Sequence, residues 1–270
     1  MKISQIHPAL YFLAVWAYRT KRWASSLFDG RTYALTKDEQ PLTFNVKFHS
    51  SVLIRKLGES ELWLQHNKVR NLQRAIPCLT GTLIRPGETF SFCRSVGLPT
   101  KWKGYVEGME IARGEPRPGV GGGICQLANM IYWLTLHSPL TVIERHHHGY
   151  DPFPDHNRTL PFGSGASVFY NYRDLRLFNP TPTTFQLNLW LTSKCLEGNI
   201  RADTEIEFTY SVFERNHRFL NIEGEPYRAN EIWRKVLRRR GGFFVTEELV
   251  TTNHARVKYA PPGWDTTCQS

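Results

Sequence analysis

Cys125 lies two residues after a run of glycines, and this placement is the first feature of the sequence that could support catalysis. The stretch GVGGGICQLANMIYWLTL, residues 119–136, changes from glycines to helix-like spacing next to the cysteine. At the first turn of a helix, the helix dipole and the unpaired backbone N–H groups stabilise a thiolate. The glycines let backbone N–H groups approach a substrate and form an oxyanion hole. The residues predicted to bind there are Gly121, Gly122, Gly123 and Gln126.

A thiol nucleophile needs a base, and histidines follow this predicted helix at once. In TVIERHHH, residues 141–148, strand alternation would place Glu144, His146 and His148 on one face. Cys125 with one of these imidazoles and Glu144 would then form a nucleophile, a base and an orienting acid. Asp151 and Asp155 are rival orienting acids, because they lie on the following loop.

Each of these features also has an alternative explanation. A lone cysteine can be a small core hydrophobe, and glycine runs before helices are common. Two histidines on one strand face could supply two zinc ligands, but at least a third ligand is needed, for which Cys125 and Asp155 are the candidates. From the residues alone, catalysis and a structural role are equally favoured and metal is less favoured. We expect no cofactor and no resident metal.

Composition indicates a folded domain throughout the chain. The 270 residues are 41% hydrophobic and 13% aromatic, which disfavours disorder. The formal charge of +10 allows anionic partners without naming one, and no nucleic-acid partner is expected. Five cysteines without regular spacing do not indicate a disulfide framework.

The N-terminal stretch predicts a helix over about 7–28 that is too short to span a membrane. Its apolar run at 8–18 is well below the roughly 20 residues that a span needs. A signal peptide fits poorly, because Lys2 is the single charge ahead of the run. We expect this helix to pack against the domain, with contact at a membrane surface as the alternative.

The remaining pattern predicts an α+β fold in which a twisted, mostly antiparallel sheet packs on a central helix. Ile124, Leu127, Ile131 and Leu134 define one apolar face of that helix. Strands are predicted over 141–148, 167–178 and 184–191, with the last two forming a hairpin, and RPG at 85–87 is a turn between two short strands. A second helix is predicted from about 61 to Pro77.

The C-terminal region is predicted to contain two strands around a helix at 229–239, which ends at the basic sequence RRRGG. We therefore divide the chain into an N-terminal region at 1–80, a core domain at 81–192 and an extension at 193–270, packed on the core.

Several stretches resemble the VanW family in order and interval. They are RPGETFSFCRSVG, KGYVEGMEI, GVGGGICQLANMIYW, LTVIERHHH and RTLPFGSGASVFYNYRDLRLFN. The start IHPALYFLAVWAYR and the tail stretches NHRF, NEIWR and TEELVT are similar to short members of that family.

The resemblance implies a role in the bacterial envelope and in glycopeptide resistance. It also implies an L,D-transpeptidase activity that makes 3-3 peptidoglycan cross-links through the motif cysteine, here Cys125. His148 matches the family's histidines most securely and His146 is the alternative base. Arg145 or Arg158 would hold a substrate carboxylate.

The implied partner is a peptidoglycan stem peptide or another cell-wall precursor. From the sequence we expect a cytoplasmic or peripheral membrane location, or an extracytoplasmic one if the chain is a transpeptidase. A non-catalytic accessory or binding protein for a wall precursor is the alternative function, because the same glycine turn and basic residues would suit precursor phosphates.

Overall fold

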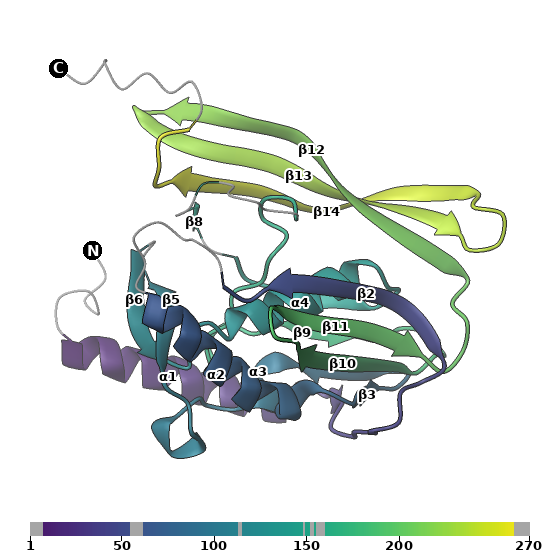
Figure 1. Cartoon of the computed structure of the whole chain (residues 1–270), viewed down its shortest axis with the longest axis horizontal. Helices are drawn as coiled ribbons and strands as arrows, with labels where there is room; N and C mark the ends of the chain where they lie inside the picture. The colour runs from purple at the N-terminus through teal and green to yellow at the C-terminus, as the bar shows by residue number, and fades with distance from the viewer. Residues whose placement is uncertain are drawn as a thin grey trace.

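The computed structural model has the expected α+β architecture. It describes residues 8–54, 62–112, 115–147, 149–151, 154 and 160–261. Its helices are α1 (Pro8–Leu27), α2 (Leu62–Leu79), the short α3 (Phe92–Val96) and α4 (Cys125–Leu136). The strands form several sheets of mostly antiparallel pairing where we expected one (Figure 1).

The central sheet packs against α4, as the apolar spacing predicted. Its order is β2 (Phe44–Val52), β11 (Cys195–Ala202), β10 (Phe185–Leu191) and β3 (Thr82–Ile84), and every pairing is antiparallel. Leu127, Ile131 and Leu134 of α4 are completely buried. A Cβ on Gly198 of β11 would lie 3.5 Å from Leu134 Cδ1, so the helix lies directly on the sheet. This sheet takes strands from all three predicted segments of the chain.

A second sheet supports the histidine-bearing strand. Its order is β1 (Thr32–Tyr33), β4 (Glu88–Ser91), β9 (Arg176–Phe178) and β7 (Thr141–Glu144). The predicted hairpin between 167–178 and 184–191 is wrong, because β9 pairs with β4 and β7 while β10 pairs with β11 and β3. The turn at Pro86 and Gly87 joins β3 to β4 as expected, but these strands belong to different sheets.

The strand predicted over 141–148 ends at Glu144. A register shift between Val142 and Glu144 interrupts its pairing with β9, and the chain is irregular from Arg145 to His147. The carbonyl oxygen of His146 instead accepts a hydrogen bond from the Ser167 amide at 2.8 Å.

The C-terminal extension is a long sheet, so the helix predicted at 229–239 is wrong. The strands are β12 (Phe208–Ile222), β13 (Glu225–Arg238) and β14 (Phe244–Val257), with β8 (Tyr150–Asp151) parallel to β14 (Figure 1). Ile232 and Val236 are buried four residues apart, a spacing that suits one face of a strand as well as one face of a helix. RRRGG contains the last residue of β13 and most of the turn to β14, and Gly241 and Gly242 adopt positive φ of 85° and 66° there.

We call the sheet of β12, β13 and β14 the tail sheet. A buried ion pair joins it to Asp151 of β8, a few residues after the histidines. Arg228 Nη1 of β13 lies 3.1 Å from Asp151 Oδ2, and both side chains are almost completely buried. Tyr259 also donates to Asp151, at 3.0 Å. Because breaking such a pair leaves a buried charge uncompensated, this contact fixes the position of the tail sheet. Asp151, a rival orienting acid in the sequence, is engaged here.

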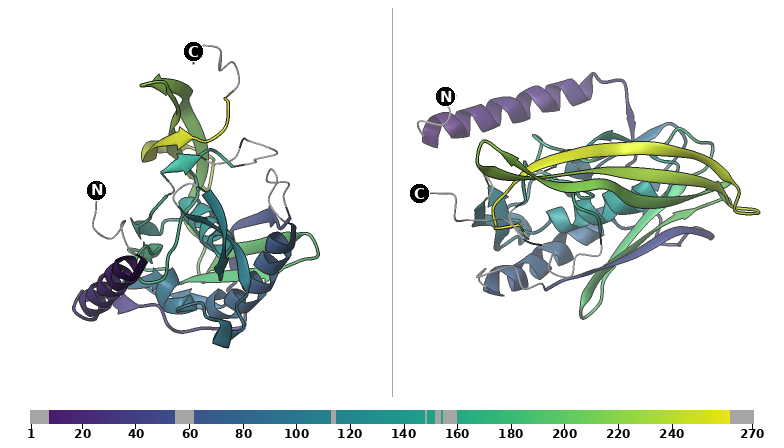
Figure 2. Two further views of the ribbon diagram at one scale, coloured as in Figure 1. Left: turned by 90° about the vertical axis from the view of Figure 1, so that its left-hand side faces the viewer. Right: turned by 90° about the horizontal axis from the view of Figure 1, so that it is seen from above.

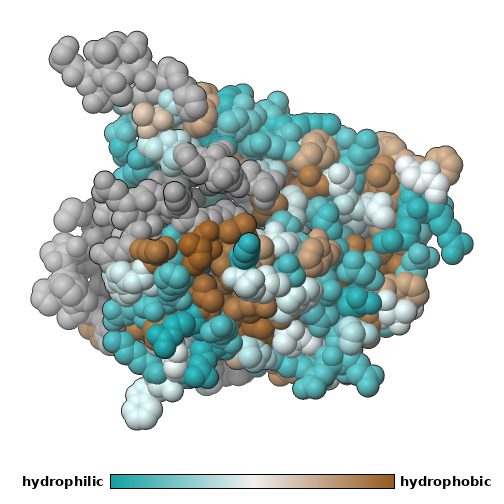
Figure 3. All heavy atoms as spheres, viewed as in Figure 1, coloured by the Kyte–Doolittle hydropathy of each residue, from teal (hydrophilic) through white to brown (hydrophobic). Residues whose placement is uncertain are grey.

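Helix α1 lies at the periphery of the molecule. Both views of Figure 2 place it along an outer edge, and the β12–β14 sheet forms a separate layer. Within the described residues, no helix is long and apolar enough to cross a membrane. On the face seen in Figure 1, apolar surface gathers near the end of β2 and the start of α2, where Val52, Ile54 and Leu62 are exposed (Figure 3).

Candidate functional site

The glycine turn before Cys125 has a backbone that other residues would strain. Gly121 and Gly123 adopt positive φ of 79° and 92°. Gly122 packs against the β5–β6 hairpin, whose strands are β5 (Glu107–Ala112) and β6 (Glu115–Val120). A Cβ on Gly122 would lie 2.1 Å from the carbonyl oxygen of Gly108, so the two backbones touch. These glycines are required by geometry and close packing.

Asn71 of α2 holds this turn in place from the interior. Its Nδ2 donates to the carbonyl oxygens of Gly122 at 2.9 Å and Val106 at 3.0 Å. Its Oδ1 accepts from the Val106 amide at 2.9 Å. Asn71 is completely buried, and sequence reasoning missed it. The available signal was a polar residue on the helix face that also carries Leu64, Leu72 and Ala75.

Most of the amides proposed for an oxyanion hole already donate hydrogen bonds nearby. Gly121 donates to Val106 at 3.0 Å, Gly122 to Gly119 at 2.9 Å, and Gln126 to Gly123 at 3.0 Å. The Ile124 amide makes a longer contact with the Gly121 carbonyl, at 3.4 Å. The amides of Gly123 and Cys125 are thus the better candidates for stabilising an oxyanion at this turn.

Cys125 is the first residue of α4 and is held as a thiol. Its Sγ donates to the carbonyl oxygen of Val168 at 3.6 Å. Burial raises the pKa of the Cys125 thiol, and the negative charge of Glu110 acts in the same direction. Hydrogen bonds at the backbone of Val168 and of Cys125 itself lower the pKa but do not reverse the shift. The resting structure therefore favours the protonated form.

Glu110 is a second residue that the sequence did not indicate. It lies on β5, and its Oε1 pairs with Arg117 Nε at 2.6 Å. A Cβ on Gly119 would lie 2.5 Å from the Glu110 Cδ, so the carboxylate covers the backbone just before the glycine turn. An acidic side chain on this side of Cys125 would repel an anionic substrate group and attract a cationic one.

Glu144 and His146 are in contact, although the strand that was predicted to align them ends at Glu144. His146 Nε2 lies 2.9 Å from Glu144 Oε1. Burial raises the pKa of Glu144, but hydrogen bonds from Arg22 and His146 and the charge of Arg22 outweigh it, so the pKa lies below its ordinary value. Glu144 also accepts from the Asp174 amide at 3.1 Å. It is therefore an ionised carboxylate that can orient the imidazole.

One short segment contacts both halves of the predicted site. The Ser167 amide donates to the His146 carbonyl oxygen at 2.8 Å, and the next residue, Val168, accepts from the Cys125 thiol. Among the residues with described positions, no hydrogen bond joins Cys125 to His146 or His147. His147 is exposed, and partial desolvation and the charges of Arg145 and Arg173 lower its pKa.

Two other predicted binding residues are engaged in structural contacts. Arg145 donates through Nε to the Gly165 carbonyl oxygen at 2.8 Å and through Nη2 to that of Gly163, and its guanidinium lies over Tyr132. Gln126 Nε2 donates to Ser51 Oγ and to the Val52 carbonyl oxygen, both at 3.0 Å. Both side chains thus hold neighbouring segments around α4.

Other predictions fall on positions for which no placement is given. His148, Arg158 and Asp155 lie outside the described residues. Within the part of the chain that is described, no three His, Cys, Asp or Glu side chains converge on a metal position. The zinc alternative named His148 and Asp155, so it stays a prediction.

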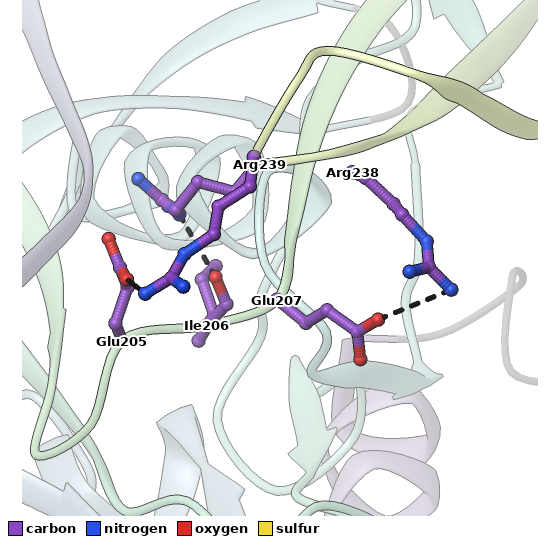
Figure 4. Close-up of a pocket in the computed structure, with 6 residues that line it drawn as sticks. Glu205, Ile206, Glu207, Arg238 and Arg239 are labelled. Carbon is purple, nitrogen blue, oxygen red and sulfur yellow. Dashed lines mark hydrogen bonds and ion pairs between the residues drawn. The ribbon is translucent and has the colours of Figure 1, made fainter.

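The three arginines of the basic sequence RRRGG line a depression of about 350 Å³ that contains none of the predicted site residues. Arg238 faces Glu207 and Arg240 faces Glu205, both at 3.7 Å, and Arg239 donates to the Ile206 carbonyl oxygen at 3.0 Å (Figure 4). Carboxylates therefore offset much of the positive charge, and this depression lies at the turn of the tail sheet.

Comparison with known proteins places the candidate site within a recognised family. Residues 67–201 match the family described as VanW like protein. The vancomycin B-type resistance protein VanW of Enterococcus faecalis is 31% identical over 240 residues, which cover 89% of this chain and 87% of that protein. The chain belongs to the VanW family.

A second relative matches a smaller part of the chain. The uncharacterized protein YoaR of Bacillus subtilis is 32% identical over 118 residues, which are 42% of this chain and 36% of that protein. No solved structure matches the chain significantly. The VanW-like region includes Asn71, the glycine turn, Cys125, Glu144 and His146, whereas α1 and the tail sheet lie outside it.

Proposed function

We propose that this VanW-family protein acts on the bacterial cell wall in glycopeptide resistance, as a cysteine-dependent acyl transferase of the L,D-transpeptidase type. The name of the Enterococcus relative supports the connection with vancomycin resistance. The proposed substrate is a peptidoglycan stem peptide. Cys125 is the proposed nucleophile, His146 the base and Glu144 the orienting acid.

The observation that carries the proposal is the shared segment at Ser167 and Val168. One residue of this segment binds the backbone of His146 and the next binds the thiol of Cys125. A substrate chain that replaced the Val168 carbonyl as the partner of the thiol would lie beside the histidine segment. Apo geometry in such sites is commonly looser than in a substrate complex. The pair of His146 and Glu144 at 2.9 Å supplies the base and its orienting acid.

The reaction proceeds by two acyl transfers. The Cys125 sulfur forms a bond with the carbonyl carbon between an L and a D residue, and its proton passes to His146. The C–N bond breaks, and the departing D-alanine amine takes that proton. An amine of a second stem then attacks the thioester, gives up a proton through His146 and forms the new amide, and Cys125 leaves as a thiol. The amides of Gly123 and Cys125 would stabilise each oxyanion.

Removal of the sulfur tests this proposal most directly. We expect Cys125→Ala and Cys125→Ser to abolish 3-3 cross-links in muropeptide profiles of cells that express the protein, because alanine has no nucleophile and the serine hydroxyl is a much weaker one than the thiol. Cys195→Ala is the matched control, since Cys195 is also a free, partly exposed cysteine but begins β11. Unchanged 3-3 products in a folded Cys125→Ala protein would exclude the transferase mechanism.

A second candidate function is recognition of a wall precursor without chemistry. The raised pKa of the Cys125 thiol favours it, because a binding protein has no need for a thiolate. Under this alternative, Cys125→Ala would keep both the resistance phenotype and precursor binding. Cell fractionation adds an independent criterion, because a protein confined to the cytoplasm cannot cross-link mature wall.

The pH dependence of thiol alkylation separates the two functions in the purified protein. Because the pKa of Cys125 is raised, we expect slow iodoacetamide labelling at pH 7 that accelerates with each pH unit above it. Addition of a stem pentapeptide should accelerate labelling at pH 7 if the substrate releases the thiol from Val168. Slower labelling with the peptide bound would favour the binding protein.

A further inference from the structure

Helix α1 is attached to the body of the protein by its polar side. Arg19 Nε donates to the Tyr170 carbonyl oxygen at 3.2 Å, and Asn171 Nδ2 donates to the Arg19 carbonyl oxygen at 2.7 Å. One turn later, Arg22 forms an ion pair with Glu144. Polar and charged contacts therefore dock this helix, in contrast to the usual inward apolar face.

The apolar face of α1 points to solvent. Leu13 is 62% exposed, Trp16 44% and Trp23 62%, and Thr20 between them is also exposed. These four residues are spaced three, four and three apart, so they form one stripe along the helix. Phe28, directly after the helix, is 86% exposed. Figure 2 shows α1 on the outer edge of the molecule.

The residue types on this stripe fit the boundary between lipid headgroups and acyl chains. Tryptophan is enriched there because its large ring is apolar while its N–H stays in a polar environment. The helix is too short in apolar length to span a bilayer but long enough to lie in its plane. An apolar stripe of two tryptophans and a leucine would otherwise remain in water at a cost in free energy.

The charge of α1 specifies the kind of surface. Its sequence PALYFLAVWAYRTKRWASSL contains three cations and no Asp or Glu. Lys21 is exposed beside the apolar stripe, and the whole chain carries +10. Basic residues flanking an apolar helical face bind anionic lipid headgroups.

We propose that α1 is a membrane-interface helix that holds the protein on an anionic bilayer through Leu13, Trp16, Trp23 and Phe28. This proposal does not require Cys125 to be catalytic. It places the Glu144 and His146 pair close to the lipid surface, because Arg22 of the same helix contacts Glu144.

Vesicle flotation tests the proposal. We expect the full chain to float with vesicles of phosphatidylglycerol and phosphatidylcholine and to bind vesicles of phosphatidylcholine alone much more weakly. Trp16→Ser with Trp23→Ser should weaken partitioning about tenfold or more, because both rings leave the apolar stripe. Trp102→Ser is the matched control: Trp102 is 99% exposed but lies in the 3-10 turn Lys101–Lys103, so partitioning should not change.

Two results would overturn the proposal. One is equal flotation of the double variant and the wild type, with circular dichroism showing that both are folded. The other is a wild-type dimer in light scattering that the double variant lacks, without flotation of either protein, since the stripe would then bind a second copy of the chain. Loss of flotation in a folded double variant that keeps its wild-type mass supports the membrane helix.

Discussion

Helices α1 and α4 are both rich in apolar residues, yet they orient their apolar faces in opposite directions. In α4, Leu127, Ile131 and Leu134 are fully buried against the central sheet. In α1, Leu13 and the two tryptophans face solvent while the arginines hold the helix to the body. Helical periodicity therefore identifies an apolar face, whereas the surrounding elements determine whether that face enters the core.

Equivalent leucine truncations should give the largest contrast between the helices. Leu134→Ala in α4 should lower the free energy of unfolding by about 3–5 kcal/mol, because it removes a fully buried side chain and leaves a cavity. Leu13→Ala in α1 should change it by less than about 0.5 kcal/mol, as expected for an exposed site. Urea denaturation measures both. Similar losses would show that α1 packs its apolar face inward.

Acid should act on the end of α4 through His137. This buried imidazole contacts Trp133, with Nδ1 2.9 Å from the Trp133 carbonyl oxygen. Burial lowers the pKa of His137 from 6.5 to about 4, and the nearby positive charge of Lys47 also lowers it. The unfolded chain thus binds more protons than the folded chain between these two pKa values. The contribution to stability is fully present above pH 6.5 and is lost as the pH falls toward 4.

The His137 contribution should be about 2 kcal/mol between pH 7 and pH 5. His137→Gln keeps a donor for the Trp133 carbonyl oxygen but does not titrate. Between pH 7 and pH 5 the free energy of unfolding of this variant should therefore fall by about 2 kcal/mol less than that of the wild type. Urea denaturation at both pH values measures the difference. Equal losses in the variant and the wild type would mean that His137 does not govern the acid sensitivity of this region.

Loss of one cation in α1 should have the smallest effect. Arg22→Ala removes an ion pair with Glu144 in which both side chains are partly exposed, so we expect a cost of about 1 kcal/mol. Amide hydrogen exchange in α1 should then be about fivefold faster, because its docked state is less populated. Lys21→Ala, one position earlier and exposed, is the control and should leave exchange unchanged. An identical effect of both substitutions would contradict docking through Arg22.

The predictable part of the fold was the part determined by local pattern. The apolar spacing from Ile124 to Leu134 predicted α4, and the alternation in 184–191 predicted β10. The partner of β10 could not be predicted, because the adjacent β9 and the later β11 were both available in sequence. The helix predicted at 229–239 was wrong for a related reason. These residues favour a helix locally, but in the structure they form β13, which pairs with β12 on one side and β14 on the other.

In the candidate site too, the features set by local sequence could be predicted, whereas those set by tertiary assembly could not. Strand alternation predicted that Glu144 and His146 share a face, and the two side chains do meet, although the strand ends at Glu144. The glycines identified the turn before Cys125. Asn71 and Val168 could not be assigned, because α2 and the segment near Ser167 approach the turn only after the sheets have assembled. The raised pKa of Cys125 was also beyond sequence reasoning, since burial in the folded structure and the charge of Glu110 cause it.

The contact between Gly122 and Gly108 excludes residues with a side chain at both positions. A side chain on Gly122 would strike the Gly108 carbonyl, one on Gly108 would strike the Gly122 carbonyl at 2.4 Å, and one on Gly123 would strike the Lys68 side chain. Replacement at either member of the pair therefore cannot be rescued by changing the other. A saturation-mutagenesis map would show these positions as intolerant even in an assay that reports folding alone. Intolerance at the glycines is therefore no measure of catalysis, whereas intolerance at Cys125 in an activity assay, with folding retained, would be one.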